Sequence, residues 1–349
     1  MVSRKAFHAV CGDIMVMKYM LSSVAAALLF FTGCTDLTEF DQTVNTGINI
    51  ISTPDLSIVH TIENIPGASS LCPLQGCFLV ATTEGTVIRY DSQTYQQTGS
   101  FTIGSPSSAG YFEMEYSPNE SSVYIIGAFG EILEYHVPDM EFMDNFTVCE
   151  SPVDIEIGTQ IELPYLYIAG AASSKIFEVR YTTNIVSRSC LLYYSPTCMA
   201  INQPQDTILI GTLGGTEIVS TGTGTMRRRA MPQFEDILAI ETIPDDTTLC
   251  AVFDYGSSKI GTILGYFQNP FSSSPILTGL VTISGNLHFM CSEADGSHVY
   301  VLSYLGDSTS RLVSYNCLDY SIENQADLQG YPVDLEICPG GTLLVLTAQ

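Results

Sequence analysis

Three short acidic motifs recur along the chain with the same spacing. Glu-Met-Glu occupies residues 113–115, Asp-Ile-Glu residues 154–156 and Asp-Leu-Glu residues 334–336. If each motif lies on a β-strand, its two carboxylates face the same side, because side chains alternate along a strand. Carboxylates crowded together repel one another unless a cation, a hydrogen-bond donor or a raised pKa relieves the repulsion.

The motifs therefore predict a binding site for a cation or a positively charged group. Ca²⁺ is the candidate metal, because it prefers several oxygen ligands, and no other cofactor is expected. The alternative is that the same carboxylates hydrogen-bond backbone amides of neighbouring structural units. The candidate residues are Glu113, Glu115, Asp154, Glu156, Glu241, Asp334 and Glu336.

Patterns for catalysis are scarce. After residue 33 the chain contains four histidines (His60, His136, His288 and His298), and no G-x-S-x-G nucleophile motif is present. His288 is the one expected near the mouth of a central channel, where a carboxylate partner would allow general-base chemistry. No CxxC pair or zinc-type Cys/His spacing occurs. We predict no catalytic residue, and favour a binding or scaffold module over an enzyme.

The acidic motifs lie within a repeat. Seven short apolar runs resemble one another, among them "FLVA" at 78, "VYII" at 123 and "LLVL" at 343, and they recur every 41 to 50 residues. Turn residues precede each run, and further alternating segments follow it. This is the period of a four-stranded propeller blade. The repeat predicts an all-β fold, a seven-bladed β-propeller spanning residues 46–349.

The two ends of this segment complement each other. The last unit reaches Gln349 with two expected strands, whereas residues 46–52 and 56–62 look like a third and a fourth strand without a first or second. We therefore expect strands from both termini to complete the last blade, which removes exposed strand edges. Truncation of a longer protein is the alternative explanation.

Three segments carry a resemblance to a known family. They are "PVDLEICPGGTLLVLT" (332–347), "SPNESSVYII" (117–126) and "ADGSHVYVL" (294–302). The chain resembles bacterial YVTN-repeat, lactonase-like propellers, although the family's "SPDG" turn is intact nowhere. The resemblance implies the fold and, as an alternative function, lactonase-like hydrolysis at the channel mouth, which would need a His/Glu/Arg cluster there. The absence of Trp argues against WD-repeat and quinoprotein propellers.

The N-terminal segment predicts export. Leu21–Phe31 is an uncharged apolar run of 11 residues after Lys18, too short to span a bilayer. The residues that follow, Thr32-Gly33-Cys34, resemble a bacterial lipoprotein signal. We expect residues 1–33 to be a signal peptide and residues 34–45 a lipidated tether, with Met17 as an alternative start that would make residues 1–16 a mis-called extension. An ordinary signal peptide is the alternative.

Charge limits the choice of partners. The chain carries 12 basic and 37 acidic residues, and its formal charge changes from −25 to −27 when residues 1–33 are removed. Such a surface repels nucleic acid. The expected partners are therefore the membrane, through the lipid anchor, and a protein or small-molecule ligand. The expected location is the cell envelope, on the periplasmic face of the outer membrane or on the cell surface.

Lipidation at Cys34 gives the first testable prediction. Cys34→Ala should abolish the diacylglyceryl mass increment in intact-mass spectra of membrane-extracted protein, because two or more acyl chains are needed for stable anchoring. Cys317→Ala should keep the increment. Soluble, unmodified wild-type protein in the culture medium would contradict the prediction.

Overall fold

The seven apolar runs form the second strands of seven four-stranded sheets. The computed structural model describes residues 45–53, 55–103, 113–117, 121–127, 130–158, 165–180, 183–202, 207–212, 214–221, 226–231, 237–242, 248–254, 262–268, 276–285 and 288–349. Every element assigned within these ranges is a β-strand, as the alternating sequence pattern predicts. Residues 42–349 form one compact unit, and the fold described below is that of this unit.

Six sheets, called blades 1 to 6, are each built from four consecutive strands. Blades 1 to 3 consist of β3 (Ala68–Leu74), β4 (Cys77–Thr82), β5 (Thr86–Asp91), β6 (Gln97–Thr102); β7 (Met114–Ser117), β8 (Ser122–Ile126), β9 (Glu131–His136), β10 (Glu141–Thr147); and β11 (Pro152–Gly158), β12 (Tyr165–Gly170), β13 (Lys175–Arg180), β14 (Ile185–Leu191).

Blades 4 to 6 repeat this order, and all neighbouring strands within a blade are antiparallel. Their strands are β15 (Pro196–Asn202), β16 (Thr207–Thr212), β17 (Gly215–Ser220), β18 (Arg227–Met231); β19 (Ile237–Thr242), β20 (Thr248–Asp254), β21 (Thr262–Gln268), β22 (Ile276–Thr282); and β23 (His288–Ser292), β24 (His298–Gly306), β25 (Thr309–Asn316), β26 (Ile322–Gln329).

The remaining sheet, called the composite sheet, joins the two ends of the described chain. Its order is β2 (Ser57–Ile62), β1 (Thr46–Ser52), β28 (Thr342–Ala348) and β27 (Tyr331–Ile337). The expected count of seven blades is therefore corrected: within the described residues, six blades are complete units of the chain. The composite sheet is not such a unit, because β1 and β28 come from opposite ends and pair along their whole length.

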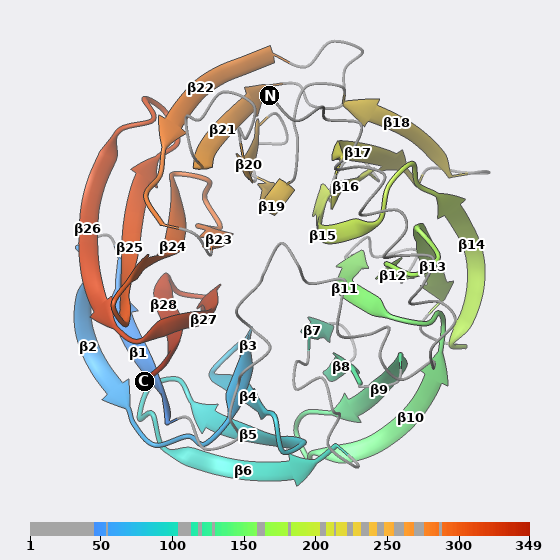
Figure 1. Cartoon of the computed structure of the whole chain (residues 1–349). Helices are drawn as coiled ribbons and strands as arrows, with labels where there is room; N and C mark the ends of the chain where they lie inside the picture. The colour runs from blue at the N-terminus through green and yellow to red at the C-terminus, as the bar shows by residue number, and fades with distance from the viewer. Residues whose placement is uncertain are drawn as a thin grey trace, which may run out of the picture. The chain divides into compact units, whose positions relative to one another are not determined.

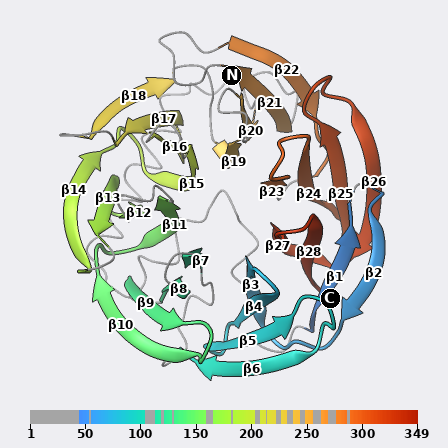
Figure 2. The ribbon, with the colours of Figure 1, turned by 180° about the vertical axis from the view of Figure 1, so that it is seen from behind.

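The sheets are arranged in a ring. Each blade's first strand packs on the first strand of the next blade, and β27 of the composite sheet packs on both β23 and β3, which completes the circle. Figure 1 shows these first strands nearest the centre and the fourth strands on the rim, and the view from behind in Figure 2 shows the same order. The β-propeller arrangement predicted from the repeat is present.

The core lies between neighbouring sheets. All residues of β8 and β16 are buried, because a second strand is covered on both faces by adjacent sheets. The outer strands are exposed instead, as in β2, where Ile58 and Val59 are each 53% accessible. This burial gradient explains why the apolar runs were the clearest signal in the sequence.

Residues 1–44 lie outside the described residues, so the signal peptide, Cys34 and most of the tether stay predictions. A helix long and apolar enough to cross a bilayer is not found in the described part of the chain.

The composite sheet yields a stability prediction. Ile50 on β1 is fully buried, so Ile50→Ala should lower the free energy of unfolding by about 2–5 kcal/mol in urea denaturation. Ile58→Ala on the exposed strand β2 should change it by less than about 0.5 kcal/mol. Similar losses in the two variants would mean that the composite sheet is not part of the cooperative core.

Candidate binding site on the innermost strands

The acidic motifs occupy equivalent places on the innermost strands. The middle residue of each motif pairs with the third residue of the following apolar run: Met114 with Ile125, Ile155 with Ile168, and Leu335 with Val345. Ile240 pairs with Ala251 in the same way, which places Glu241 in register with the second acid of each motif. The register therefore brings the predicted residues to two levels of the ring.

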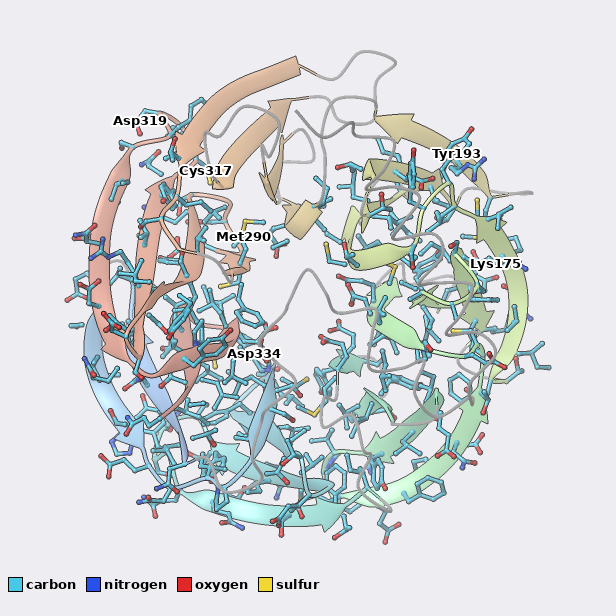
Figure 3. All side chains as sticks on the ribbon, in the orientation of Figure 1. Lys175, Tyr193, Met290, Cys317, Asp319 and Asp334 are labelled. Atoms are coloured by element: carbon cyan, nitrogen blue, oxygen red, sulfur yellow. The ribbon has the colours of Figure 1, made fainter. Side chains whose placement is uncertain are left out.

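The upper level contains the first acid of each motif, and the lower level contains the second. Glu113 lies immediately before β7, Asp154 on β11 and Asp334 on β27. Glu115, Glu156 and Glu336 are their lower-level counterparts, and Glu241 on β19 is a fourth lower-level residue. Figure 3 shows Asp334 and Met290 towards the inner side of the ring, and Tyr193 and Asp319 on its rim. All seven sequence-predicted carboxylates thus belong to innermost strands or their immediate flank.

Upper-level aspartates hold neighbouring sheets together. The carboxylate of Asp334 accepts hydrogen bonds from the amide of Leu71 in blade 1, at 2.7 Å, and from the amide of Leu335, at 2.8 Å. Asp154 likewise accepts from the amide of Met199 in blade 4 and from its neighbour Ile155. The structural alternative considered for the motifs is therefore correct for these two residues.

A register irregularity directly precedes these aspartates. The pairing shifts between Pro152 and Asp154 in β11 and between Pro332 and Asp334 in β27, and similar shifts occur in β3, β15 and β19. An extra residue of this kind locally bends a strand and re-aims the next side chain. We infer that the bulge turns each aspartate towards the amide of the adjacent sheet.

Lower-level glutamates are different. Across the described residues, Glu115, Glu156 and Glu336 form no hydrogen bond or ion pair, and all three are half-buried. Glu241 accepts from the amide of Thr242 at 3.1 Å. Among the described residues, three of the four lower-level carboxylates thus have no hydrogen-bond donor.

The crowding of the lower-level glutamates raises their pKa values. Burial raises the pKa of Glu115 to about 8, with a further rise from the charges of Asp154 and Glu241. Burial and the neighbouring carboxylates also raise the pKa of Glu156 and of Glu336 well above the ordinary value. Glu241 on blade 5 thus acts on Glu115 of blade 2, so the carboxylates interact across several blades.

In the two aspartates and in Glu241, hydrogen bonds reduce the rise in pKa that burial causes. Burial raises the pKa of Asp154 to about 7 and that of Asp334 to about 6, although the backbone amides that each one binds act in the opposite direction. Burial also raises the pKa of Glu241 to about 7, against the hydrogen bonds from Thr242 and Ser292. Near neutral pH, this group of carboxyls shares protons.

Sequence reasoning missed the thiols at this site. Cys72 on β3 and Cys291 on β23 occupy the register positions of Glu115 and Glu336, and both are buried. Burial and the surrounding carboxylates raise the pKa of both thiols well above 9.0. Their equal offset from the apolar runs could have revealed them. All eight cysteines from Cys72 on that the structure describes are free thiols.

The described histidines do not support a hydrolase centre. His60 stacks on Tyr95 at 4.9 Å between ring centres, and Nδ1 of His136 lies 2.7 Å from Asp139 on an outer turn. His298 lies on the second strand of blade 6. The side chain of His288 is outside the described set, and no His/Glu/Arg cluster is found on the innermost strands as described.

The predicted Ca²⁺ site would need several of these side chains at one point. In the described part of the chain, no group of three or more His, Cys, Asp or Glu side chains is placed to hold one metal ion.

Comparisons with known proteins identify the fold alone. No family model matches the sequence, and no curated protein matches it. The structure matches 1535 solved chains, so the fold is too common to indicate an activity. One of them is Kuenenia stuttgartiensis hydrazine synthase, with 12% sequence identity and a TM-score of 0.63 over 79% of this chain and 91% of that chain. The comparison supports a propeller-type fold, and the YVTN-family assignment stays a prediction.

The crowded carboxyls predict how stability depends on pH. A carboxyl with a raised pKa keeps its proton in the folded state after the unfolded chain has lost it, so stability falls as the pH rises through the folded pKa values. We expect wild-type stability to fall between about pH 5 and pH 8. The inner triple variant, Glu115→Gln, Glu156→Gln and Glu336→Gln, should be more stable than wild type at pH 8 by on the order of 2 kcal/mol, since one pKa unit is about 1.4 kcal/mol.

Urea denaturation at pH 5 and pH 8 measures both values. The matched control is the surface triple variant, Glu63→Gln, Glu84→Gln and Glu141→Gln, which removes the same charge from exposed sites. If the surface variant gained as much stability at pH 8 as the inner variant, general charge repulsion would explain the effect.

Proposed function

We propose that this protein is a lipid-anchored, extracytoplasmic binding module that takes a positively charged group on the inner side of its propeller. The observation that carries the proposal is the lower-level set of Glu115, Glu156 and Glu336. These carboxylates lie on three innermost strands and have no hydrogen-bond or ion-pair partner among the described residues. Carboxyls whose pKa is raised by burial and by neighbouring charges are typical of functional sites.

The chemistry of the site favours an organic cation over a bare metal ion. A divalent metal needs several ligands at one point, about 2.0–2.6 Å from the ion, and such a group is not found in the described residues. Ammonium and guanidinium groups instead donate several hydrogen bonds in different directions. A polyamine, or a lysine or arginine side chain of a partner, therefore fits the separated carboxylates.

Anchoring completes the proposal. Acylation at Cys34 would attach the chain to a membrane of the cell envelope, and residues 35–45 would link the anchor to β1. A net charge of −25 supports a cationic ligand, because an acidic surface attracts positive groups over a distance of about 10 Å at moderate salt.

Thermal denaturation tests the binding site. Spermidine should raise the melting temperature of the wild-type protein saturably at constant ionic strength, because a ligand that binds the folded state stabilises it by mass action. The rise should be larger at pH 8 than at pH 5, since protonated carboxyls bind cations poorly. The inner triple variant should lose the saturable rise, and the surface triple variant should keep it.

Two results would contradict the proposal. Equal responses of the inner and surface variants would reduce the effect to screening of surface charge. A saturable response to CaCl₂ without one to spermidine would assign the site to a metal ion and exclude the organic cation.

A further inference from the structure

A second titratable cluster lies outside the innermost strands, in blade 6. His298, the first residue of β24, has carboxylates at both ring nitrogens: Nδ1 is 2.9 Å from Oε2 of Glu293, and Nε2 is 2.9 Å from Oε2 of Glu323. A neutral imidazole has one N–H group, so it can donate to only one of them. Both contacts are hydrogen bonds when the ring carries two protons and a positive charge.

Glu293 continues the cluster inward. It follows β23, and its Oε1 accepts a hydrogen bond of 2.6 Å from the hydroxyl of Tyr300, while its Oε2 accepts one of 2.6 Å from Ser297. The Tyr300 side chain is fully buried. The charge of Glu293 is therefore held by three donors, one of which is His298.

Tyr300 connects the cluster to the composite sheet. Its hydroxyl proton is donated to Glu293, so the connection is made by the packing of its buried ring. The ring of Tyr300 packs in an apolar cluster that includes residues from both sheets. The members of that cluster from the composite sheet and its β1–β2 turn are Ile51, Leu56, Leu335, Leu343 and Val345.

The outer arm of the cluster reaches the rim. Glu323 on β26 also accepts a hydrogen bond of 2.7 Å from the side-chain amide of Asn316. The charged groups around His298 are acidic: Glu293 and Asp295 from the turn after β23, Glu323 from β26, and Asp319, which acts on Glu323 from the turn before β26. His298 is the one positive group that the described residues place between them.

We propose that His298, Glu293 and Glu323 form a pH-sensitive latch at the seam between blade 6 and the composite sheet, closed when the imidazole carries two protons and loosened when it loses one. The latch holds the sheet in which the two ends of the described chain meet. Its loss leaves the carboxylate of Glu293 with one donor fewer and loosens the position of Tyr300, whose ring packs against residues of the composite sheet.

The direction of the pH effect follows from the contacts. Burial opposes the charge of His298, but its hydrogen bonds to Glu293 and Glu323 outweigh burial and raise its pKa above 6.5. Likewise, hydrogen bonds from Ser297, Tyr300 and His298 outweigh burial and lower the pKa of Glu293 below 4.5. The latch is therefore at full strength between about pH 4.5 and pH 6.5, and it is lost as the pH rises through the raised pKa of His298.

Amide hydrogen exchange at pH 6 and pH 8, corrected for the intrinsic exchange rate, tests the latch in the full chain. The readout is the protection of seam peptides covering residues 46–53, 288–302 and 338–345. Wild-type protection should fall by at least about tenfold between the two pH values, as the loss of a charge-assisted hydrogen bond gives. His298→Gln should have low protection at pH 6 and a smaller further fall by pH 8 than wild type. His136→Gln, which removes another carboxylate-paired histidine in blade 2, should behave as wild type.

The carboxyls of the innermost strands also make the fold less stable as the pH rises. The His298→Gln variant separates their effect on seam protection from that of the latch. If His298→Gln kept the wild-type pH dependence at the seam, those carboxyls would be responsible and the latch would be wrong. Should the variant fold poorly, an NMR titration of wild-type histidines decides: a His298 pKa above 6.5 supports the latch, and one at or below 6.5 overturns it.

Discussion

The backbone pairing of β1 with β28 is the interaction on which the rest of the ring depends. Each sheet buries both faces against its two neighbours, so an open ring would expose two apolar faces. The ladder joins seven residue pairs, from Thr46 with Ala348 to Ser52 with Thr342. Because the two strands come from opposite ends of the segment, the last contact closes only when the whole ring is formed. Such long-range pairing links the stability of every blade to one sheet.

Closure also creates the electrostatic conditions at the centre. First strands that approach one another have an unpaired edge, and the aspartates Asp154 and Asp334 satisfy amides on the edge of the next sheet. The same approach brings the glutamates at the lower level into mutual repulsion. The upper-level aspartates therefore stabilise contact between sheets. The lower-level glutamates, two residues further along the strand, reduce stability at neutral pH. That cost is easier to understand if the lower level binds something positive.

The composite sheet takes part in both acidic networks. Its strand β27 contributes Asp334 and Glu336 to the centre, and its apolar residues pack in one cluster with Tyr300, which donates to Glu293 in blade 6. Both networks contribute less stability as the pH rises, but through different groups. In the centre, carboxyls resist losing protons; at the seam, an imidazole holds its second proton between two carboxylates. A change in either network reaches the sheet that holds the ring together.

The sequence by itself determined the all-β class, the blade repeat and the strands that carry the acidic motifs, because apolar runs at a fixed period report burial on both faces. It also indicated the half-units that form the composite sheet. Only the tertiary structure decided which acids are bonded: Asp334 and Glu336 look equivalent in the motif, yet Asp334 follows a register shift and accepts from Leu71, whereas Glu336 has no hydrogen-bond donor among the described residues. Likewise, only the packing of neighbouring strands brings His298 to Glu293 and Glu323, whereas the offset of Cys72 and Cys291 from the apolar runs is readable in the sequence. Contacts between strands depend on register and on neighbouring sheets, and neither is written in the spacing of one motif.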